Sequence, residues 1–112
     1  VGLDSINDYY DISVKYGRLS NAGISIDEVE YNKPLVSKKH TNYKFIKLNL
    51  EDNNNLTELF ASEKFDAVCN LAAQAGVRYS ITNPDTYIET NIKGFSNNAI
   101  NMLNLKRVNK VL

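Results

Sequence analysis

The chain has 112 residues, of which 43% are hydrophobic and 23% charged, as is ordinary for one modest globular domain. Its 13 basic and 13 acidic residues balance, which argues against nucleic acid or an anionic membrane surface as a partner, and no apolar run is long enough to span a bilayer. The single cysteine, Cys69, has no internal disulfide partner, and no secretory signal is visible, so we expect a cytoplasmic protein. Cys69 stands in an apolar run, which favours an inert core cysteine over a reactive thiol.

The first half of the sequence predicts a strand, a helix and a second strand. Residues 1–3 are mostly apolar and precede an acid, which is typical of the end of a strand. Asp11 or Ser13 is expected to cap a short helix. Residues 24–39 have weak periodicity and predict an irregular or partly helical excursion. Residues 43–48 alternate in polarity and are rich in strand-forming residues, so they predict a strand.

The second half predicts two helices around a buried strand. Residues 52–55 have the side chains of a helix cap, and apolar residues follow at helical spacing: Leu56, Leu59 and Phe60. The apolar run 65–71 is typical of a strand covered on both faces. Asn83 followed by Pro84 is a strong helix start. The helix after it has one apolar face: Ile88, Ile92, Phe95, Ala99 and Leu103. Residues 111–112 resemble the start of a further strand.

The alternation of strands and helices predicts an α/β fold with a doubly wound parallel sheet. The sequence contains no internal repeat and no low-complexity linker. Both ends of the sequence resemble cuts through a larger fold. We therefore expect residues 1–112 to form a single fragment of one domain.

Polar and small residues stand where the predicted strands end, which is where ligands bind in an open parallel sheet. Asp4 is an acid at such an end and is suited to the hydroxyls of an adenosine ribose, although its position alone favours a loop or helix-capping aspartate. Asn49 could hold an adenine edge or simply form a turn. Ala72 and Ala73 leave room for a ligand against the backbone, or for tight packing of the strand on a helix.

Two further side chains carry a weaker signal. Arg78 could pair with a phosphate or a carboxylate, but a lone arginine in a loop is more often a surface residue. Asn91 lies within a helical turn of Ile88 and Ile92 and is equally well explained as inward-facing or as exposed. From the residues alone, none of these positions is decisive.

Four stretches become specific when they are taken together: DSINDYYD at 4–11, FIKLNLED at 45–52, FDAVCNLAAQAGVRYS at 65–80, and NP at 83–84 with YIETNIKG at 87–94. They resemble the extended short-chain dehydrogenase/reductase family, and within it the NAD-dependent epimerases that act on UDP-glucuronate. The run AAQAGVRYS is the most specific part. The related sugar-nucleotide 4,6-dehydratases usually have Ala-Ala-Glu-Ser-His-Val-Asp at this place.

The resemblance implies a Rossmann-like NAD-binding fold and a UDP-sugar substrate in a homodimeric parent protein of nucleotide-sugar and polysaccharide biosynthesis. It implies two sets of site residues and no metal. The implied NAD-binding positions are Asp4, Ser5, Asn7, Asn49, Leu50, Leu71, Ala72, Ala73, Gln74 and Asn91. The implied substrate-binding positions are Gly76, Val77, Arg78 and Ser80. At position 49 the family commonly has Asp, so the adenine contact there depends on the orientation of the Asn49 amide.

Two parts of the family pattern are missing from the sequence. The first strand with its glycine-rich phosphate loop belongs before Val1, and the catalytic Ser/Thr and Tyr-x-x-x-Lys set belongs after Leu112. Tyr43 and Lys47 have the right spacing but fall in a predicted strand, where side chains four residues apart are about 13 Å from each other. We therefore expect no catalytic residue in this chain.

The implied function is that of a fragment of an NAD-dependent epimerase, in which hydride passes reversibly from C4 of the sugar to NAD through a 4-keto sugar, and we expect the fragment to be inactive by itself. Two alternatives remain open. One is a non-catalytic nucleotide-binding module that kept the fold. The other is a different sugar-nucleotide oxidoreductase, such as a dehydratase or a decarboxylase.

Overall fold

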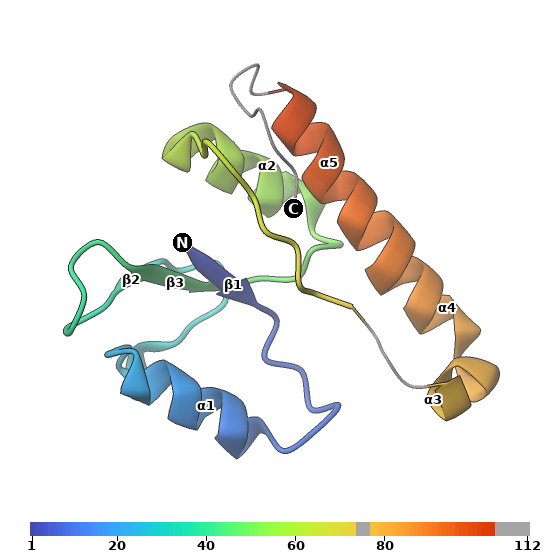
Figure 1. Cartoon of the computed structure of the whole chain (residues 1–112), viewed down its shortest axis with the longest axis horizontal. Coiled ribbons are helices and arrows are strands. Elements are labelled where there is room, and N and C mark those ends of the chain that lie inside the picture. The colour runs from blue at the N-terminus through green and yellow to red at the C-terminus, as the bar shows by residue number, and fades with distance from the viewer. Residues whose placement is uncertain (74–76, 105–112) are drawn as a thin grey trace. The chain divides into compact units, whose positions relative to one another are not determined.

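The computed structural model describes residues 1–73 and 77–104, which belong to two compact units that divide after Leu48 (Figure 1). Each unit is described here by itself. Unit 1 contains a small sheet and one long helix, and unit 2 contains the remaining helices.

Unit 1 is built on a three-stranded mixed sheet in the order β1-β3-β2 (Figure 1). β1 (Gly2–Asp4) and β3 (Lys44–Lys47) are parallel, with Leu3 opposite Ile46. The chain returns from β1 to β3 through a helix, as a parallel pair requires. The predicted strand over residues 43–48 is confirmed.

The third strand corrects the expectation of a purely parallel sheet. β2 (Leu35–Val36) pairs antiparallel with β3, with Leu35 opposite Phe45. It lies in residues 24–39, which we expected to be irregular or partly helical and which also hold one 3-10 turn, Ile26–Glu28. A two-residue strand has too little periodicity to be visible in a sequence.

The helix of unit 1, α1 (Ile12–Asn21), is capped by Asp11, one of the two caps that the sequence predicted. The Asp11 side chain accepts a hydrogen bond from the backbone N–H of Ser13 at 2.9 Å. The helix ends before Gly23, whose φ of +81° is in the left-handed region that favours glycine. The core of the unit comprises Ile6, Leu19, Ile24 and Phe45, with Tyr16, Val29, Leu35 and Tyr43 packed around it.

Unit 2 begins with the predicted second helix, α2 (Asn53–Glu63). Asp52 caps it: its carboxylate accepts from the backbone N–H of Asn55 at 3.3 Å and from the Asn55 amide at 2.7 Å. The helix ends at Lys64, which is left-handed with φ +52°. Its buried residues are the three that the spacing predicted: Leu56, Leu59 and Phe60.

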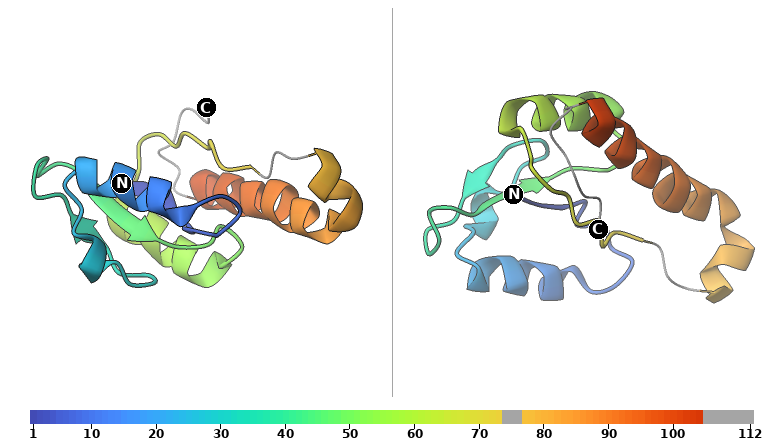
Figure 2. Two further views of the ribbon diagram at one scale, coloured as in Figure 1. Left: turned by 90° about the horizontal axis from the view of Figure 1, so that it is seen from below. Right: turned by 45° about the horizontal axis from the view of Figure 1, so that its top comes forward.

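The last described helical segment is continuous from Pro84 to Asn104 (Figures 1 and 2). It comprises α4 (Pro84–Tyr87), a π-helical stretch η2 (Ile88–Gly94) and α5 (Phe95–Asn104). The predicted start is confirmed, with Asn83 at the cap position and Pro84 in the first turn, although the Asn83 side chain makes no capping hydrogen bond. A short helix, α3 (Val77–Thr82), precedes it and was not predicted.

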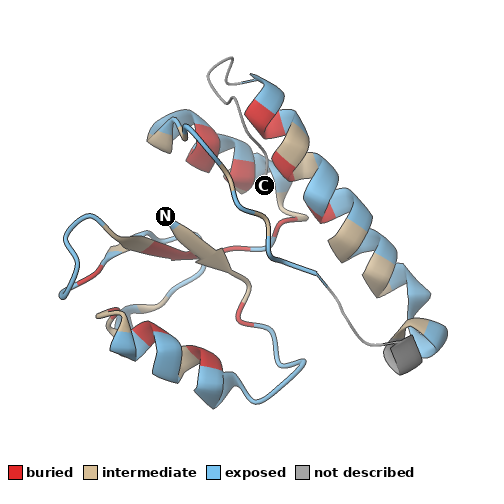
Figure 3. Ribbon diagram, in the orientation of Figure 1, coloured by how far each residue is buried: buried red, intermediate tan, exposed pale blue. Residues whose placement is uncertain are grey.

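α5 packs against α2 through polar contacts as well as apolar ones. The Asn97 amide donates to the backbone carbonyl of Leu50 at 2.9 Å, and the Asn101 amide lies 3.4 Å from Asn53 Oδ1. Asn101 and Met102 are buried, whereas Leu103 is exposed. Buried and exposed positions alternate along the last helical segment (Figure 3). The predicted apolar face is therefore not the face that packs inside this unit: Ile88, Ile92, Phe95 and Leu103 are 47–78% exposed.

Two further expectations about unit 2 are wrong. Residues 65–71 form no strand in the described part of the chain, where Val68 alone makes a single-residue β-bridge. An apolar run becomes a buried strand only where neighbouring strands pair along it. Cys69, which we expected in a core, is exposed for the same reason. Phe65 instead packs edge-on against Phe60, with ring centroids 5.2 Å apart.

Candidate functional site

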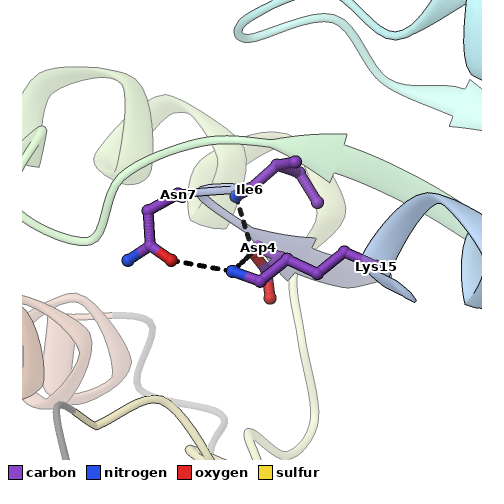
Figure 4. Close-up of polar contacts among 4 residues, drawn as sticks. All are labelled: Asp4, Ile6, Asn7 and Lys15. Atoms are coloured by element: carbon purple, nitrogen blue, oxygen red, sulfur yellow. Dashed lines mark hydrogen bonds and ion pairs between the residues drawn. The ribbon is translucent and has the colours of Figure 1, made fainter. Parts of the chain in front are cut away.

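The carboxylate of Asp4, at the end of β1, is the best-defined polar feature among the candidate residues. Its Oδ1 atom accepts a hydrogen bond from the backbone N–H of Ile6 at 2.6 Å (Figure 4). The backbone carbonyl of Asp4 accepts from the N–H of Leu48 at 3.2 Å, which holds this strand end against the chain that leaves β3. The Asp4 side chain remains 46% exposed.

The loop after Asp4 is held in an unusual conformation. Ile6 has φ +51°, in the left-handed region that a β-branched residue rarely adopts. Its side chain is only 8% exposed and belongs to the core of unit 1. Burial of the side chain and the hydrogen bond to Asp4 offset the backbone strain, which is about 1–3 kcal/mol. The packing of Ile6 in the core of unit 1 therefore determines the conformation of the loop.

Lys15 on α1 reaches the same loop and was missed by the sequence analysis. Its side chain is 8% exposed, and its Nζ lies 2.8 Å from Asn7 Oδ1 and 3.4 Å from Asp4 Oδ1 (Figure 4). The same amine lies 4.8 Å from the centre of the Tyr10 ring. One sequence signal was available, since Lys15 stands four residues before the buried Leu19 and therefore shares its helical face.

The structure thus brings three of the expected NAD-binding positions, Asp4, Ser5 and Asn7, into one loop of unit 1. In this loop Asp4 and Asn7 are both bonded to Lys15. The second carboxylate oxygen of Asp4 and the amide nitrogen of Asn7 have no hydrogen-bond partner among residues 1–73 and 77–104. They are therefore the groups that a ligand can use.

Two expected positions lie at the start of unit 2. Asn49 is exposed, whereas Leu50 is 8% exposed. The backbone of Leu50 is tied to α5 by Asn97, and its side chain lies so close to Gly94 that a Cβ added there would be 2.9 Å from the Leu50 Cβ. Leu50 therefore has a structural role in this unit, whatever ligand lies beside it.

The expected positions at 71–73 lie on an exposed stretch of backbone. Leu71 is 89% exposed, and Ala72 and Ala73 are also exposed. The N–H of Ala72 donates to the side chain of Asn70 at 3.3 Å, a local contact typical of asparagine. Small side chains on exposed backbone are what the close approach of a ligand requires. Gln74 and Gly76 lie outside the described residues.

The remaining expected positions are on helices. Val77, Arg78 and Ser80 belong to α3; Ser80 is half-buried, and the side chains of the other two lie outside the described part. Asn91 is half-buried in the π-helical stretch η2. Such stretches interrupt regular helices and are frequent at functional sites. The sequence contained no signal for the π-helical geometry.

Tyr43 directly precedes β3, and Lys47 is its last residue. This confirms that the Tyr-x-x-x-Lys spacing falls on an extended segment. Partial burial raises the pKa of the Tyr43 hydroxyl. A catalytic tyrosinate needs a lowered pKa, so the environment of Tyr43 opposes that role. Among the described residues, no cluster of His, Cys, Asp and Glu has the makeup of a metal site.

The comparison with known families decides the affiliation of the chain. A family model described as GDP-mannose 4,6 dehydratase matches residues 8–111. The chain belongs to this family of NAD-dependent epimerases and dehydratases. The match extends over both compact units.

Individual members of the epimerase/dehydratase family are similar over most of this chain. Protein CapI of Staphylococcus aureus is 45% identical over 97 residues, which are 87% of this chain and 24% of that protein. A UDP-glucuronate 4-epimerase of Thermodesulfobacterium geofontis is 34% identical over 107 residues, or 96% of this chain and 27% of the relative. UDP-glucuronate 4-epimerase 4 of Arabidopsis thaliana is 40% identical over 100 residues, which are 87% of this chain and 18% of that protein. The chain thus spans about a quarter of the length of these relatives, or less.

NAD is the cofactor of the epimerase/dehydratase family. The loop at Asp4 fits the adenosine ribose of NAD, because it offers one free carboxylate oxygen and one free amide nitrogen on a half-exposed surface. A negative charge at this place opposes a 2′-phosphate.

No helix in the described part of the chain is long and apolar enough to cross a membrane.

Proposed function

We propose that this chain is part of the NAD-binding domain of a UDP-glucuronate 4-epimerase. The observation that carries the proposal is the Asp4 carboxylate, which is anchored through Oδ1 and half-exposed at the end of a parallel strand. Relatives that are named UDP-glucuronate 4-epimerase support the substrate. The family match across residues 8–111 supports the assignment of both units to one domain.

In this proposal, the free groups of the unit 1 loop hold the adenosine ribose of NAD. Asp4 accepts from a ribose hydroxyl, and Asn7 and Ser5 complete the contact. The NAD-binding positions proposed in unit 2 are Asn49, Leu50, Leu71, Ala72, Ala73, Gln74 and Asn91. Asn49 and Leu50 flank the adenine, and the backbone at 71–74 runs beside the cofactor.

The substrate side of the proposed site is formed by Gly76, Val77, Arg78 and Ser80. The guanidinium of arginine suits phosphate and carboxylate, and a UDP-uronate carries both. Bound NAD⁺ supplies the redox chemistry, which is the reversible removal of hydride from C4 of the sugar. The protein supplies binding and orientation. A homodimeric parent and a cytoplasmic location remain predictions from the sequence.

We also propose that the chain by itself does not turn over substrate. The sequence holds no Tyr-x-x-x-Lys other than Tyr43 to Lys47, and that pair falls on an extended segment. The first experiment is incubation of UDP-glucuronate and NAD⁺ with the 112-residue chain and with the full-length gene product. Proton NMR of the sugar then identifies the product.

The proposal predicts the C4 epimer as the product of the full-length protein and no product from the 112-residue chain. Release of carbon dioxide would identify a decarboxylase. Turnover of a neutral UDP- or GDP-hexose to a 4-keto-6-deoxy sugar would identify a dehydratase, the alternative to which the name of the family model points. NAD⁺ binding without any product would identify a binding module.

A further inference from the structure

The amine of Lys15 contacts the loop that carries Asp4 and Asn7, and the Lys15 side chain is almost completely shielded from solvent. The side chain is only 8% exposed, which is far less than is usual for a lysine on a surface helix. The proposal above does not use it as a ligand of NAD. A buried lysine beside a candidate site needs a physical explanation.

The ammonium group of lysine has three donors and no acceptor. Two of its neighbours are oxygens, Asn7 Oδ1 at 2.8 Å and Asp4 Oδ1 at 3.4 Å (Figure 4). The third is the Tyr10 ring, 4.8 Å away and within the range of a cation–π contact. All the neighbours of the amine are therefore protein groups, which leaves no free donor for a ligand.

This arrangement fixes the polarity of Asn7. Because the Lys15 amine can only donate, the Asn7 oxygen must face it, and the Asn7 amide nitrogen must point away. Asp4 is fixed in the same way: Lys15 and the Ile6 N–H both engage Oδ1, so Oδ2 is left to accept from outside the protein. The loop thus presents one acceptor and one donor side by side.

We infer that Lys15 is a positioning residue that sets the hydrogen-bonding polarity of Asp4 and Asn7 toward the vicinal hydroxyls of a ribose. The inference rests on the proposed binding of NAD by this loop. The 2′-hydroxyl donates to Asp4 Oδ2, and the 3′-hydroxyl accepts from the Asn7 amide. Lys15 acts through these two side chains and does not touch the ligand, so it is not a ligand for a 2′-phosphate.

The test compares two ligands in the full-length protein by isothermal titration calorimetry: NAD⁺ and its analogue that lacks the adenosine 2′-hydroxyl. A hydrogen bond to a charged group predicts a preference of about tenfold or more for NAD⁺ in the wild type. In Lys15→Met we expect this ratio to fall toward one. In Lys15→Arg, which keeps a donor-only cation, we expect most of the ratio to return.

Lys38→Met is the matched control. Lys38 is also paired with a carboxylate in unit 1, at 3.2 Å from Glu28, but it is 71% exposed and far along the chain from the loop. We expect its ratio to equal that of the wild type. If Lys15 had a merely structural role, its replacement would weaken the binding of both ligands equally. The ratio of the two affinities would then stay unchanged.

Asn7→Leu tests the same inference without changing a buried residue, because Asn7 is exposed. Leucine has nearly the shape of asparagine but cannot donate, so the preference for NAD⁺ over the analogue that lacks the adenosine 3′-hydroxyl should fall. A wild-type ratio in a folded Lys15→Met, or a wild-type preference for the 3′-hydroxyl in Asn7→Leu, overturns the inference and leaves the proposed function intact. A wild-type protein that binds no NAD⁺ overturns both.

Discussion

The Asp4 carboxylate and the backbone N–H of Ile6 are joined by a hydrogen bond of 2.6 Å, and Ile6 is held at φ +51°. This contact links the end of β1 to the core, because the Ile6 side chain is buried with Leu19 and Phe45. The acid at the strand end is consequently fixed from two sides. One of its oxygens belongs to the fold and the other is free for function.

The first prediction concerns the free oxygen of Asp4. We expect Asp4→Ala to weaken NAD⁺ binding by about 10- to 100-fold, because a hydrogen bond to a charged group is lost. We also expect the preference for NAD⁺ over NADP⁺ to shrink, since the repulsion of a 2′-phosphate is removed. Titration of both cofactors against the full-length protein measures the two effects.

Asp8→Ala is the control for Asp4→Ala. Asp8 is an exposed acid in the same loop and makes no hydrogen bond or ion pair within the described residues. Its replacement should leave both affinities unchanged. Equal losses in the two variants would mean that the general charge of the loop matters, and the specific role of Asp4 would be refuted.

The second prediction compares two helical glycines. A Cβ at Gly94 would stand 2.9 Å from the Cβ of Leu50, whereas a Cβ at Gly17 in α1 would meet no atom within 4 Å. Gly94→Ala should therefore destabilise by about 1–3 kcal/mol through overpacking. Gly17→Ala should stabilise by about 1 kcal/mol through helix propensity.

Urea unfolding of both glycine variants measures these free energies. The two substitutions add the same methyl group, so the opposite signs isolate the effect of the contact with Leu50. A stabilising Gly94→Ala would show that the close approach of Gly94 and Leu50 is absent in solution.

The third prediction concerns the cap of α2. Replacement of Asp52 by Ala removes the acceptor for the N–H of Asn55 and should cost about 1 kcal/mol of stability. Asn54→Ala, an exposed substitution in the first turn of the same helix, should change stability by less than about 0.5 kcal/mol. Circular dichroism during urea unfolding distinguishes them, and equal effects of the two variants would contradict a capping role.

The fourth prediction is a pH dependence at the start of α1. The hydrogen bond from the Ser13 N–H lowers the pKa of the Asp11 carboxyl. Because the pKa is lower in the folded state, the cap stabilises above the pKa of the unfolded chain, and the stabilisation is lost as the pH falls through the folded value. This loss should occur below about pH 4.

Asp11→Asn provides the comparison, since asparagine caps about as well as aspartate but does not titrate. The difference in stability between wild type and Asp11→Asn should change between pH 5 and pH 2 in the direction of a weaker wild type at low pH. A carboxyl pKa for Asp11 at or above its usual value, measured by NMR, would contradict the cap geometry.

Much of the local structure followed from the sequence by itself. Asp11, Asp52 and Asn83–Pro84 start helices where their cap chemistry predicted, and the alternating residues 43–48 contain β3. These features depend on a few neighbouring residues, because a cap acts within the first turn of a helix and alternation relates successive residues of a strand. The resemblance of the quoted motifs also predicted the family to which the chain belongs.

The tertiary structure decided which side chains are buried and which are free. The run 65–71 has the pattern of a buried strand but forms none in the described part, and Cys69 is exposed, because burial depends on what pairs with a segment. The polarity of Asp4 and Asn7 likewise depends on Lys15, eight or more residues away in sequence. Helix caps and strand patterns depend on neighbouring residues and can be predicted from them. The direction in which a carboxylate or amide points is set by a partner that only folding brings into contact.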